Sequence, residues 1–212
     1  MTNNSFSTSC KKCDRLATYL KESKKKYPTY FCKPVPSFGD QEASLLIIGL
    51  APGLHGANAT GRPFTGDYAG ILLYNTLHKF GFSTAPQSEH VDDGLELINT
   101  RITNAVKCVP PQNKPTPAET RMCNQYLKQE LNILSKDTIV LALGRIAHEA
   151  TLRALGIRLK DYPFGHEAIH EIPDHFTLID SYHCSRYNTQ TRRLTVDQFE
   201  NVFAKITQML KN

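Results

Sequence analysis

Four of the six cysteines stand where they could bind one metal group. Cys10 and Cys13 form a Cys-x-x-Cys pair. Cys108 follows a short apolar run, and Cys123 begins the apolar stripe of an expected helix, where it could also be an ordinary buried residue. Four thiolates suit either a tetrahedral zinc ion or a [4Fe–4S] cluster, and composition does not choose between them. Of the two remaining cysteines, Cys32 could replace one of the four.

Three segments between apolar runs carry residues suited to binding and proton transfer. The first is rich in Gly and Pro and ends at Asp67, the second begins at Asn104, and the third contains His183. A carboxylate, an amide and an imidazole could together orient a ligand, move a proton and stabilise negative charge. Each alone also has a plain structural explanation: a helix N-cap for Asp67, a turn residue for Asn104 and a structural histidine for His183.

The elements around these segments can be read from local patterns. Short apolar runs predict buried strands, and helical periodicity with capping signals predicts the helices between them. Thr116 with Glu119, and Thr195 with Gln198, are typical of capping boxes. The expected strands cover residues 45–49, 101–106, 138–143 and 176–179, and the expected helices cover residues 68–80, 117–134, 145–155 and 195–210.

Strands that alternate with helices predict an α/β fold with a mainly parallel sheet covered on both faces. In such sheets, ligands bind beyond the carboxyl ends of the strands. Residues 49–67, 104–108 and 182–188 all lie at such ends. We therefore expect the three segments to form one shared site.

Length and composition limit the class of protein. The 212 residues suit a single domain spanning 1–212, with a net charge of +5 and a pI near 8.8. The sequence shows no signal peptide and no apolar run long enough to cross a bilayer, so we expect a cytoplasmic monomer with no membrane partner. There, cysteines indicate metal binding rather than disulfides. The positive charge agrees with DNA as a partner, although the Lys-rich run 21–26 is typical of a solvated helix face.

Longer motifs in the same segments resemble those of one family. The motifs are KPVPSFGD (33–40), GLAPGLHGANATGRPFTGD (49–67), ITNAVKCVPP (102–111) and YHCSRYNTQ (182–190). They resemble the uracil-DNA glycosylase superfamily and, within it, family 5, the type-B iron–sulfur glycosylases. The resemblance implies a three-layer α/β/α sandwich with a central, mainly parallel four-stranded sheet.

The resemblance also implies a [4Fe–4S] cluster. The residues alone leave a zinc ion as the alternative. Such a cluster is structural and holds loops near the DNA. Its ligands would be Cys10, Cys13, Cys108 and Cys123. One position departs from the family pattern, because Cys184 stands where a His-Pro-Ser motif has proline. Since proline stiffens a loop, we expect a looser loop with the role of His183 retained, and the thiol could oxidise if it is exposed.

For this family the resemblance implies excision of a base from DNA. A base inside a duplex cannot be reached, so the enzyme must rotate it into a pocket. Phe64 is the expected stacking residue, with a role as core anchor as the alternative. Asn104 is expected to bind the edge of the base. His183 is expected to stabilise the departing base, as an oxyanion-type donor does.

The residue that positions the attacking water is less clearly indicated. Other branches of the superfamily place an acid or an amide where this chain has Ala51. Asp67 is the expected substitute, and the role of helix N-cap is an equal alternative for it. His55 and Asn58 are further candidates on the same loop. They complete the expected substrate-binding loop with Ala51 and with Gly53, at which backbone can approach a ligand closely.

The third segment is expected to contact DNA. Arg186 and Tyr187 could insert into the duplex where the base has left the stack. Ser185 and Asn188 could bind phosphate or fix the loop. The expected partner is DNA that contains uracil or other damaged bases.

These patterns predict a monofunctional DNA-repair glycosylase that hydrolyses the N-glycosidic bond of uracil and leaves an abasic site. The family-5 resemblance implies tolerance of other deaminated or damaged bases. One alternative is a non-catalytic protein that binds DNA lesions on the same fold. A second is an acyl hydrolase that uses Ser185 and His183, although the Gly-x-Ser-x-Gly pattern is absent. A third is a zinc-stabilised DNA-binding domain.

Overall fold

The computed structural model describes residues 6–211. Among these residues, six strands form one sheet in the order β1-β3-β2-β4-β6-β5. Its four central strands pair in parallel and correspond to the four strands predicted from the sequence. They are β2 (Leu45–Gly49), β3 (Thr100–Asn104), β4 (Ile139–Leu143) and β6 (Thr177–Ser181).

The sheet has two more strands than the four that were expected. β1 (Phe38–Gly39) and β5 (Ile169–Glu171) pair antiparallel at its two edges. Both are short, and neither is a buried apolar run of the kind that identifies a strand in a sequence. The predicted number of strands was therefore wrong, whereas the mainly parallel character of the sheet is confirmed.

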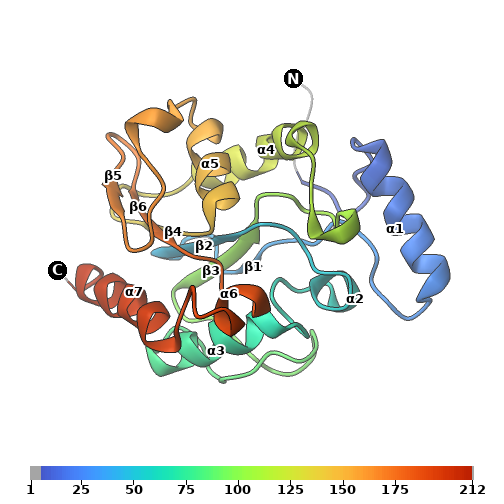
Figure 1. The fold of residues 1–212 in the computed structure, drawn as a ribbon, viewed down its shortest axis with the longest axis horizontal. Helices are drawn as coiled ribbons and strands as arrows, with labels where there is room; N and C mark the ends of the chain where they lie inside the picture. Colours follow the sequence, from blue (N-terminus) through green and yellow to red (C-terminus); the bar gives the residue numbers. More distant parts are fainter. Residues whose placement is uncertain (1–5, 212) are drawn as a thin grey trace.

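Side chains of the central strand β2 alternate between two cores, because successive residues of a strand point to opposite faces. Leu45 and Ile47 pack with α3 and α7, whereas Leu46 and Ile48 pack with α4 and α5. Figure 1 shows these two pairs of helices on opposite faces of the sheet, so the three-layer α/β/α sandwich is confirmed. The helices are α3 (Tyr68–Lys79), α4 (Pro117–Leu131), α5 (Arg145–Ala154) and α7 (Val196–Met209).

The remaining helices lie outside these two layers or in loops. α1 (Asp14–Lys26) ends in three exposed lysines, which confirms the solvated helix face expected there. The capping boxes at Thr116 and Thr195 are both present. Within residues 6–211, no helix is both long and apolar enough to span a membrane. The short elements are α2 (Ala57–Thr60), α6 (Arg186–Gln190), and the 3₁₀ turns η1 (Pro111–Asn113) and η2 (Leu159–Asp161).

The segments that follow two neighbouring parallel strands lead to opposite faces of the sheet. β2 and β4 lie side by side, yet the chain after β2 leads to α3 on one face and the chain after β4 leads to α5 on the other. At such a switch point the two connections diverge and leave a crevice at the carboxyl ends of the strands. The topology therefore provides a binding place before any side chain is considered.

Candidate active site

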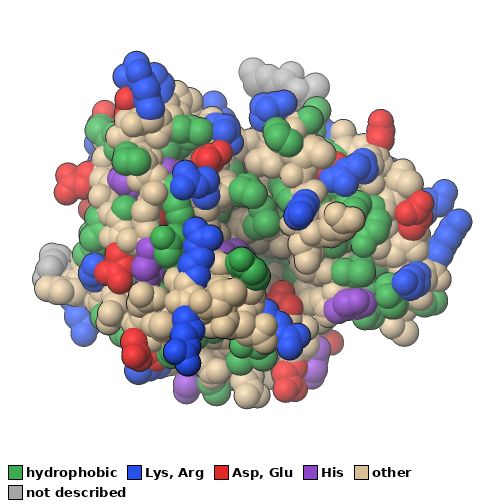
Figure 2. Space-filling model, in the orientation of Figure 1, with side chains coloured by type: hydrophobic (Ala, Val, Ile, Leu, Met, Phe, Trp, Pro, Cys, Tyr) green, Lys and Arg blue, Asp and Glu red, His purple; other side chains and the backbone are tan. Residues whose placement is uncertain are grey.

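A pocket of about 630 Å³ opens at the carboxyl end of the sheet. This volume is within the range of small-molecule sites. Figure 2 shows the hollow near the centre of this face of the molecule, with Lys and Arg side chains at its edge. Residues that end or follow each of the four central strands line it. Among them are Ala51, Asn104, Arg145 and His183.

Asn104 and Phe64 converge over Gly49, the last residue of β2. A Cβ at Gly49 would lie 2.4 Å from Asn104 Oδ1 and 2.6 Å from Phe64 Cζ, so only glycine leaves room for both. Phe64 adopts a φ of 54°, in the left-handed region, and its ring stacks on that of His183 with centroids 5.9 Å apart. Phe64 both lines the pocket and belongs to the core beside α3, so it is a core anchor, and its role in stacking a base stays a prediction.

The two carboxylate oxygens of Asp67 have different surroundings. Oδ1 accepts a hydrogen bond from Gly70 N at 2.8 Å and caps α3. Oδ2 lies toward the first loop, 2.6 Å from the place a Cβ would occupy at Gly56 and 3.6 Å from that place at Gly53. Burial raises the pKa of Asp67, against the opposing hydrogen bonds from backbone. The bond from Gly70 uses Oδ1, and Oδ2 lies on the side of the first loop, at the pocket that Asp67 lines.

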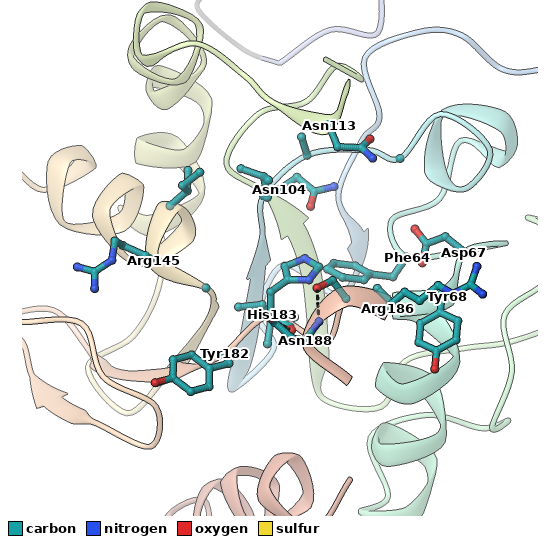
Figure 3. Close-up of a pocket in the computed structure, with 18 of the residues that line it drawn as sticks. Phe64, Asp67, Tyr68, Asn104, Asn113, Arg145, Tyr182, His183, Arg186 and Asn188 are labelled. Carbon is teal, nitrogen blue, oxygen red and sulfur yellow. Dashed lines mark hydrogen bonds between the residues drawn. The ribbon is translucent and has the colours of Figure 1, made fainter. Parts of the chain in front are cut away.

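His183 lies in the loop after β6 and is neutral at neutral pH, because burial lowers its pKa to about 4. Its Nδ1 is buried and has no hydrogen-bond partner among residues 6–211. A buried N–H without a partner is costly, so the single proton of the neutral ring belongs on Nε2. Figure 3 shows His183 beside Phe64 at the centre of the pocket, with Asn104 and Asp67 on the neighbouring walls. The ring can thus donate one hydrogen bond into the pocket.

The loop that carries His183 is tied by its own hydrogen bonds. Asn188 Nδ2 donates to His183 O at 2.8 Å (Figure 3), and Ser185 Oγ caps α6 by accepting from Asn188 N at 3.4 Å. Cys184 is fully buried, and burial raises the pKa of its thiol. The condition for oxidation of Cys184 is therefore not met, because the side chain points into the core beside α3 and α7.

The other residues of the third segment lie near the mouth of the pocket. Arg186 is exposed and its guanidinium lies 5.8 Å from the centroid of the Tyr68 ring. Tyr187 is 70% exposed and lies outside the pocket lining. Ser185 and Asn188 line the pocket, although their side chains already bond within the loop.

The four cysteines predicted as ligands gather in one cluster beside α1 and α4. Tyr126 Oη donates to Cys10 Sγ at 3.2 Å, and Lys107 N donates to Cys123 Sγ at 3.3 Å. Burial raises the pKa of Cys123 to about 11, and the charges of Cys13 and Cys10 contribute to the rise. These thiols are therefore close enough to influence one another. Cys32 lies elsewhere, where its sulfur accepts a hydrogen bond from the Asn58 amide at 3.5 Å.

The sequence matches the family model described as the Uracil DNA glycosylase superfamily over residues 36–210. The chain belongs to this superfamily. It is 45% identical over 207 residues to the type-5 uracil-DNA glycosylase of Thermus thermophilus, covering 95% of this chain and 94% of the relative. It is 38% identical to a protein of the same name from Pyrobaculum aerophilum, covering 92% and 87%. A type-4 uracil-DNA glycosylase of Archaeoglobus fulgidus is 34% identical over 66% of this chain and 56% of the relative.

Two residues that were predicted to bind substrate from the first loop do not line the pocket. His55 is exposed, with its Nδ1 3.0 Å from Tyr30 Oη. Asn58 is fully buried behind the loop, where its Nδ2 donates to Leu54 O at 3.3 Å. Ala51 and Gly53, from the same loop, do line the pocket.

The sequence interpretation missed a group of arginines and aromatic rings on the opposite wall. Arg145 lies over the Phe164 ring at 5.3 Å, and Arg193 lies over the Tyr182 ring at 4.7 Å. All four line the pocket, as does Asn113. Tyr182 could have been found, because it opens the third segment. The other residues lie outside the motifs that carry the resemblance, and no local signal marks them.

Proposed function

We propose that this protein removes uracil from DNA by hydrolysing the N-glycosidic bond, leaving an abasic site. The observation that carries the proposal is that Phe64, Asp67, Asn104 and His183 meet in one open pocket at the switch point of the sheet. Relatives that match nearly the whole chain bear the name type-5 uracil-DNA glycosylase. The fold, the side chains and the relatives thus point to the same reaction.

Phe64 and Asn104 supply recognition of the base. The Phe64 ring offers an apolar face on which a flipped pyrimidine can stack. The Asn104 amide has a donor and an acceptor, which matches the alternating N–H and C=O groups of a uracil edge. Because Gly49 brings both groups against the strand end, the two contacts have a fixed separation. A base that satisfies both is held in one orientation.

Asp67 and His183 supply the chemistry of bond cleavage. As the bond between sugar and base breaks, the base gains negative charge and the sugar gains positive charge. The N–H of neutral His183 stabilises the departing anion without first giving up its proton. The Oδ2 of Asp67 stabilises the cationic sugar and orients the water that attacks it. No lysine among residues 6–211 lines the pocket, so hydrolysis without strand cleavage is the expected outcome.

Arginines at the mouth supply binding to the DNA backbone. Arg145, Arg186 and Arg193 each lie against an aromatic ring at the pocket wall. Guanidinium groups held in this way bind phosphate with little loss of side-chain freedom. Tyr187, the most exposed ring of the third segment, would fill the gap that a flipped base leaves.

A [4Fe–4S] cluster is the group that best fits the cysteines. Sulfurs around one zinc ion lie about 3.8 Å apart, given Zn–S bonds of about 2.3 Å. Within residues 6–211, no three of these sulfurs lie within 4.8 Å of one another, which favours a larger group. Bound there, it supplies a structural cross-link. The chain between the last two ligands carries Asn113 on the pocket wall, and Ala51 packs against the cysteines. The proposed ligands are Cys10, Cys13, Cys108 and Cys123.

The proposal is tested on duplex oligonucleotides that hold one uracil opposite guanine. Cleavage of the uracil strand only after treatment with alkali is expected, because hydrolysis leaves an abasic site that alkali breaks. Strand cleavage without alkali would show a different reaction. Binding of the duplex without any abasic product, by protein with its full iron content, would instead support a lesion-binding protein. Duplexes with hypoxanthine or xanthine test the wider range of bases that we propose.

A further inference from the structure

Three ionisable side chains meet behind the pocket wall, where the proposed reaction does not use them. His148 comes from α5, His170 from β5 and Asp180 from β6. One possible ligand atom from each lies within 4.8 Å of the other two. The side chains of His148 and Asp180 are buried, whereas that of His170 keeps 11% exposure.

The His148 ring stands between two hydrogen-bond acceptors. Its Nε2 lies 2.9 Å from Tyr162 O, and its Nδ1 lies 2.8 Å from Asp180 Oδ1. A carbonyl oxygen can only accept, so Nε2 carries a proton. A neutral ring would then direct the lone pair of Nδ1 at a carboxylate oxygen, and the two would repel. A cation must therefore lie between Nδ1 and Asp180, and it is either a second proton or a metal ion.

The surroundings match those of a bound metal. A histidine ligand commonly donates its outer N–H to a backbone carbonyl, as His148 does to Tyr162 O. The second oxygen of Asp180 lies 3.2 Å from His170 Nε2, and Gly165 N donates to it at 3.4 Å. Around a tetrahedral ion, ligand atoms bound at about 2.0–2.2 Å lie roughly 3.4 Å apart. The 3.2 Å between His170 and Asp180 is close to this value, whereas the 2.8 Å between His148 and Asp180 is shorter and would have to widen around the ion.

We propose that His148, His170 and Asp180 bind a divalent transition-metal ion, with zinc the best fit. Two imidazoles and one carboxylate are a typical donor set for zinc, and a water can complete four ligands. The partly exposed side of His170 gives the ion a route into the site. This site is separate from the cysteine cluster, which lies beside α1 and α4.

The ion would fasten three elements beneath one wall of the pocket. The Phe164 ring packs edge-on against His148 at 5.6 Å and also lines the pocket. Asp180 stands three residues before His183 on the same strand and loop. The site would thus fix the segments that follow β4 and β6, whereas the cysteine cluster would fix the segment that follows β3. This role does not depend on which base the pocket accepts.

Zinc titration of the purified holoprotein tests the proposal. Protein with its full iron content is stripped of loosely bound zinc and then titrated against a colorimetric zinc indicator. The wild type is expected to take up one equivalent. His170→Ala, which removes the partly exposed ligand, is expected to bind at least about 100-fold more weakly, because even loss of a partner behind a ligand costs about 10–100-fold. His175→Ala changes a histidine in the same hairpin but outside the trio, and is expected to bind like the wild type.

A thermal shift gives a second reading that does not depend on the indicator. Zinc should raise the melting temperature of the wild type and of His175→Ala, because it binds only the folded site, but not that of His170→Ala. The proposal is overturned if the wild type takes up no zinc, since a second proton then bridges His148 and Asp180. It is also overturned if His170→Ala binds zinc equally well, or if uptake occurs only as iron is lost.

Discussion

The two sides of the pocket are built in different ways. The β2–β3 side holds its groups by close approach of backbone. A Cβ added at Gly49, Gly56 or Gly70 would lie within 2.6 Å of an atom of Asn104, Asp67 or Phe64. The β4–β6 side presents arginines on aromatic rings, with the histidine–aspartate trio beneath. The β2–β3 side comprises Ala51, Phe64, Asp67 and Asn104, and the β4–β6 side comprises Arg145, Phe164, Tyr182, His183 and Arg193.

The two sides therefore suit different tasks. The β2–β3 side suits the positioning of reacting groups, and the β4–β6 side suits the attraction of DNA. A ring or carboxylate packed against glycine backbone cannot move far, so the β2–β3 side suits groups whose geometry decides the rate. Arginine–aromatic pairs at the mouth suit contact with a charged and flexible polymer. His183 is the exception, because it lies on the β4–β6 side yet stacks on Phe64 of the other. Substitutions on the first side should therefore change the rate, and those at the mouth should change binding.

The largest loss is expected from Asp67→Asn. Asparagine is as good a helix N-cap as aspartate, so α3 should keep its first turn while the carboxylate charge is lost. The single-turnover rate of uracil release should fall by about 10²–10⁴-fold, with the melting temperature and DNA affinity close to those of the wild type. Full activity of this variant would show that Asp67 acts only as the N-cap of α3.

His183→Ala should lower the same rate by about 10²–10³-fold, the usual cost of removing one donor to a developing anion. The donor is the neutral ring, whose pKa is about 4. The loss should therefore have the same size across pH 6–8, which rate measurements on both proteins can check. His90→Ala changes an exposed histidine away from the pocket and serves as the control. A loss that disappears at high pH would show that a charged histidine acts instead.

Gly49→Ala tests positioning by backbone directly. The new Cβ would force the Asn104 amide and the Phe64 ring apart, so the rate should fall by about 10–100-fold, from misplaced groups. Gly165→Ala is the matched change on the β4–β6 side, where the new Cβ would meet Ala168 at an ordinary 3.6 Å. Near-normal rates are expected for it. Equal losses in both variants would remove the contrast between the two sides.

The same contrast explains what the sequence could predict. Strands β2, β3, β4 and β6 and the long helices after them follow local patterns, and so do the capping boxes. The edge strand β5 has only three residues, stabilised by pairing with β6 rather than by an apolar run. No pattern in the sequence of β5 indicates that pairing.

Site residues on the β2–β3 side were predictable because one continuous motif carries most of them. Even there, the motif could not show which side chains of the loop point inward. His55 and Asn58 have suitable chemistry but point outward and behind the loop. Arg145 and Phe164, on the other side, come from elements that only tertiary structure brings together. The sequence also left the exposure of Cys184 open, because packing against the core decides its burial.

Acid stability offers a smaller and separate test of His183. At pH 5 the unfolded chain binds a proton at this residue, whose usual pKa is about 6.5, and the folded chain, with a pKa of about 4, does not. Stability is therefore complete above about pH 6.5 and falls as pH decreases toward 4. The loss at pH 5 is about 2 kcal/mol. In urea unfolding at pH 7.5 and 5.0, His183→Gln should lose less stability than the wild type. Equal losses of stability in the two proteins would show that a group other than His183 takes up the proton.

The smallest effect is expected at the mouth, from Arg145→Ala and Arg193→Ala. Each removes a cation that the β4–β6 side presents to DNA, so affinity should fall a few-fold for every sequence and the salt slope of log Kd should decrease by about 1. Arg153→Ala is the matched control, because Arg153 lies on the same helix α5 but pairs with Glu149 outside the pocket. The single-turnover rate at saturating protein should stay unchanged. A lower rate at saturation would show that these arginines also position the flipped base, and the division between the two sides would fail.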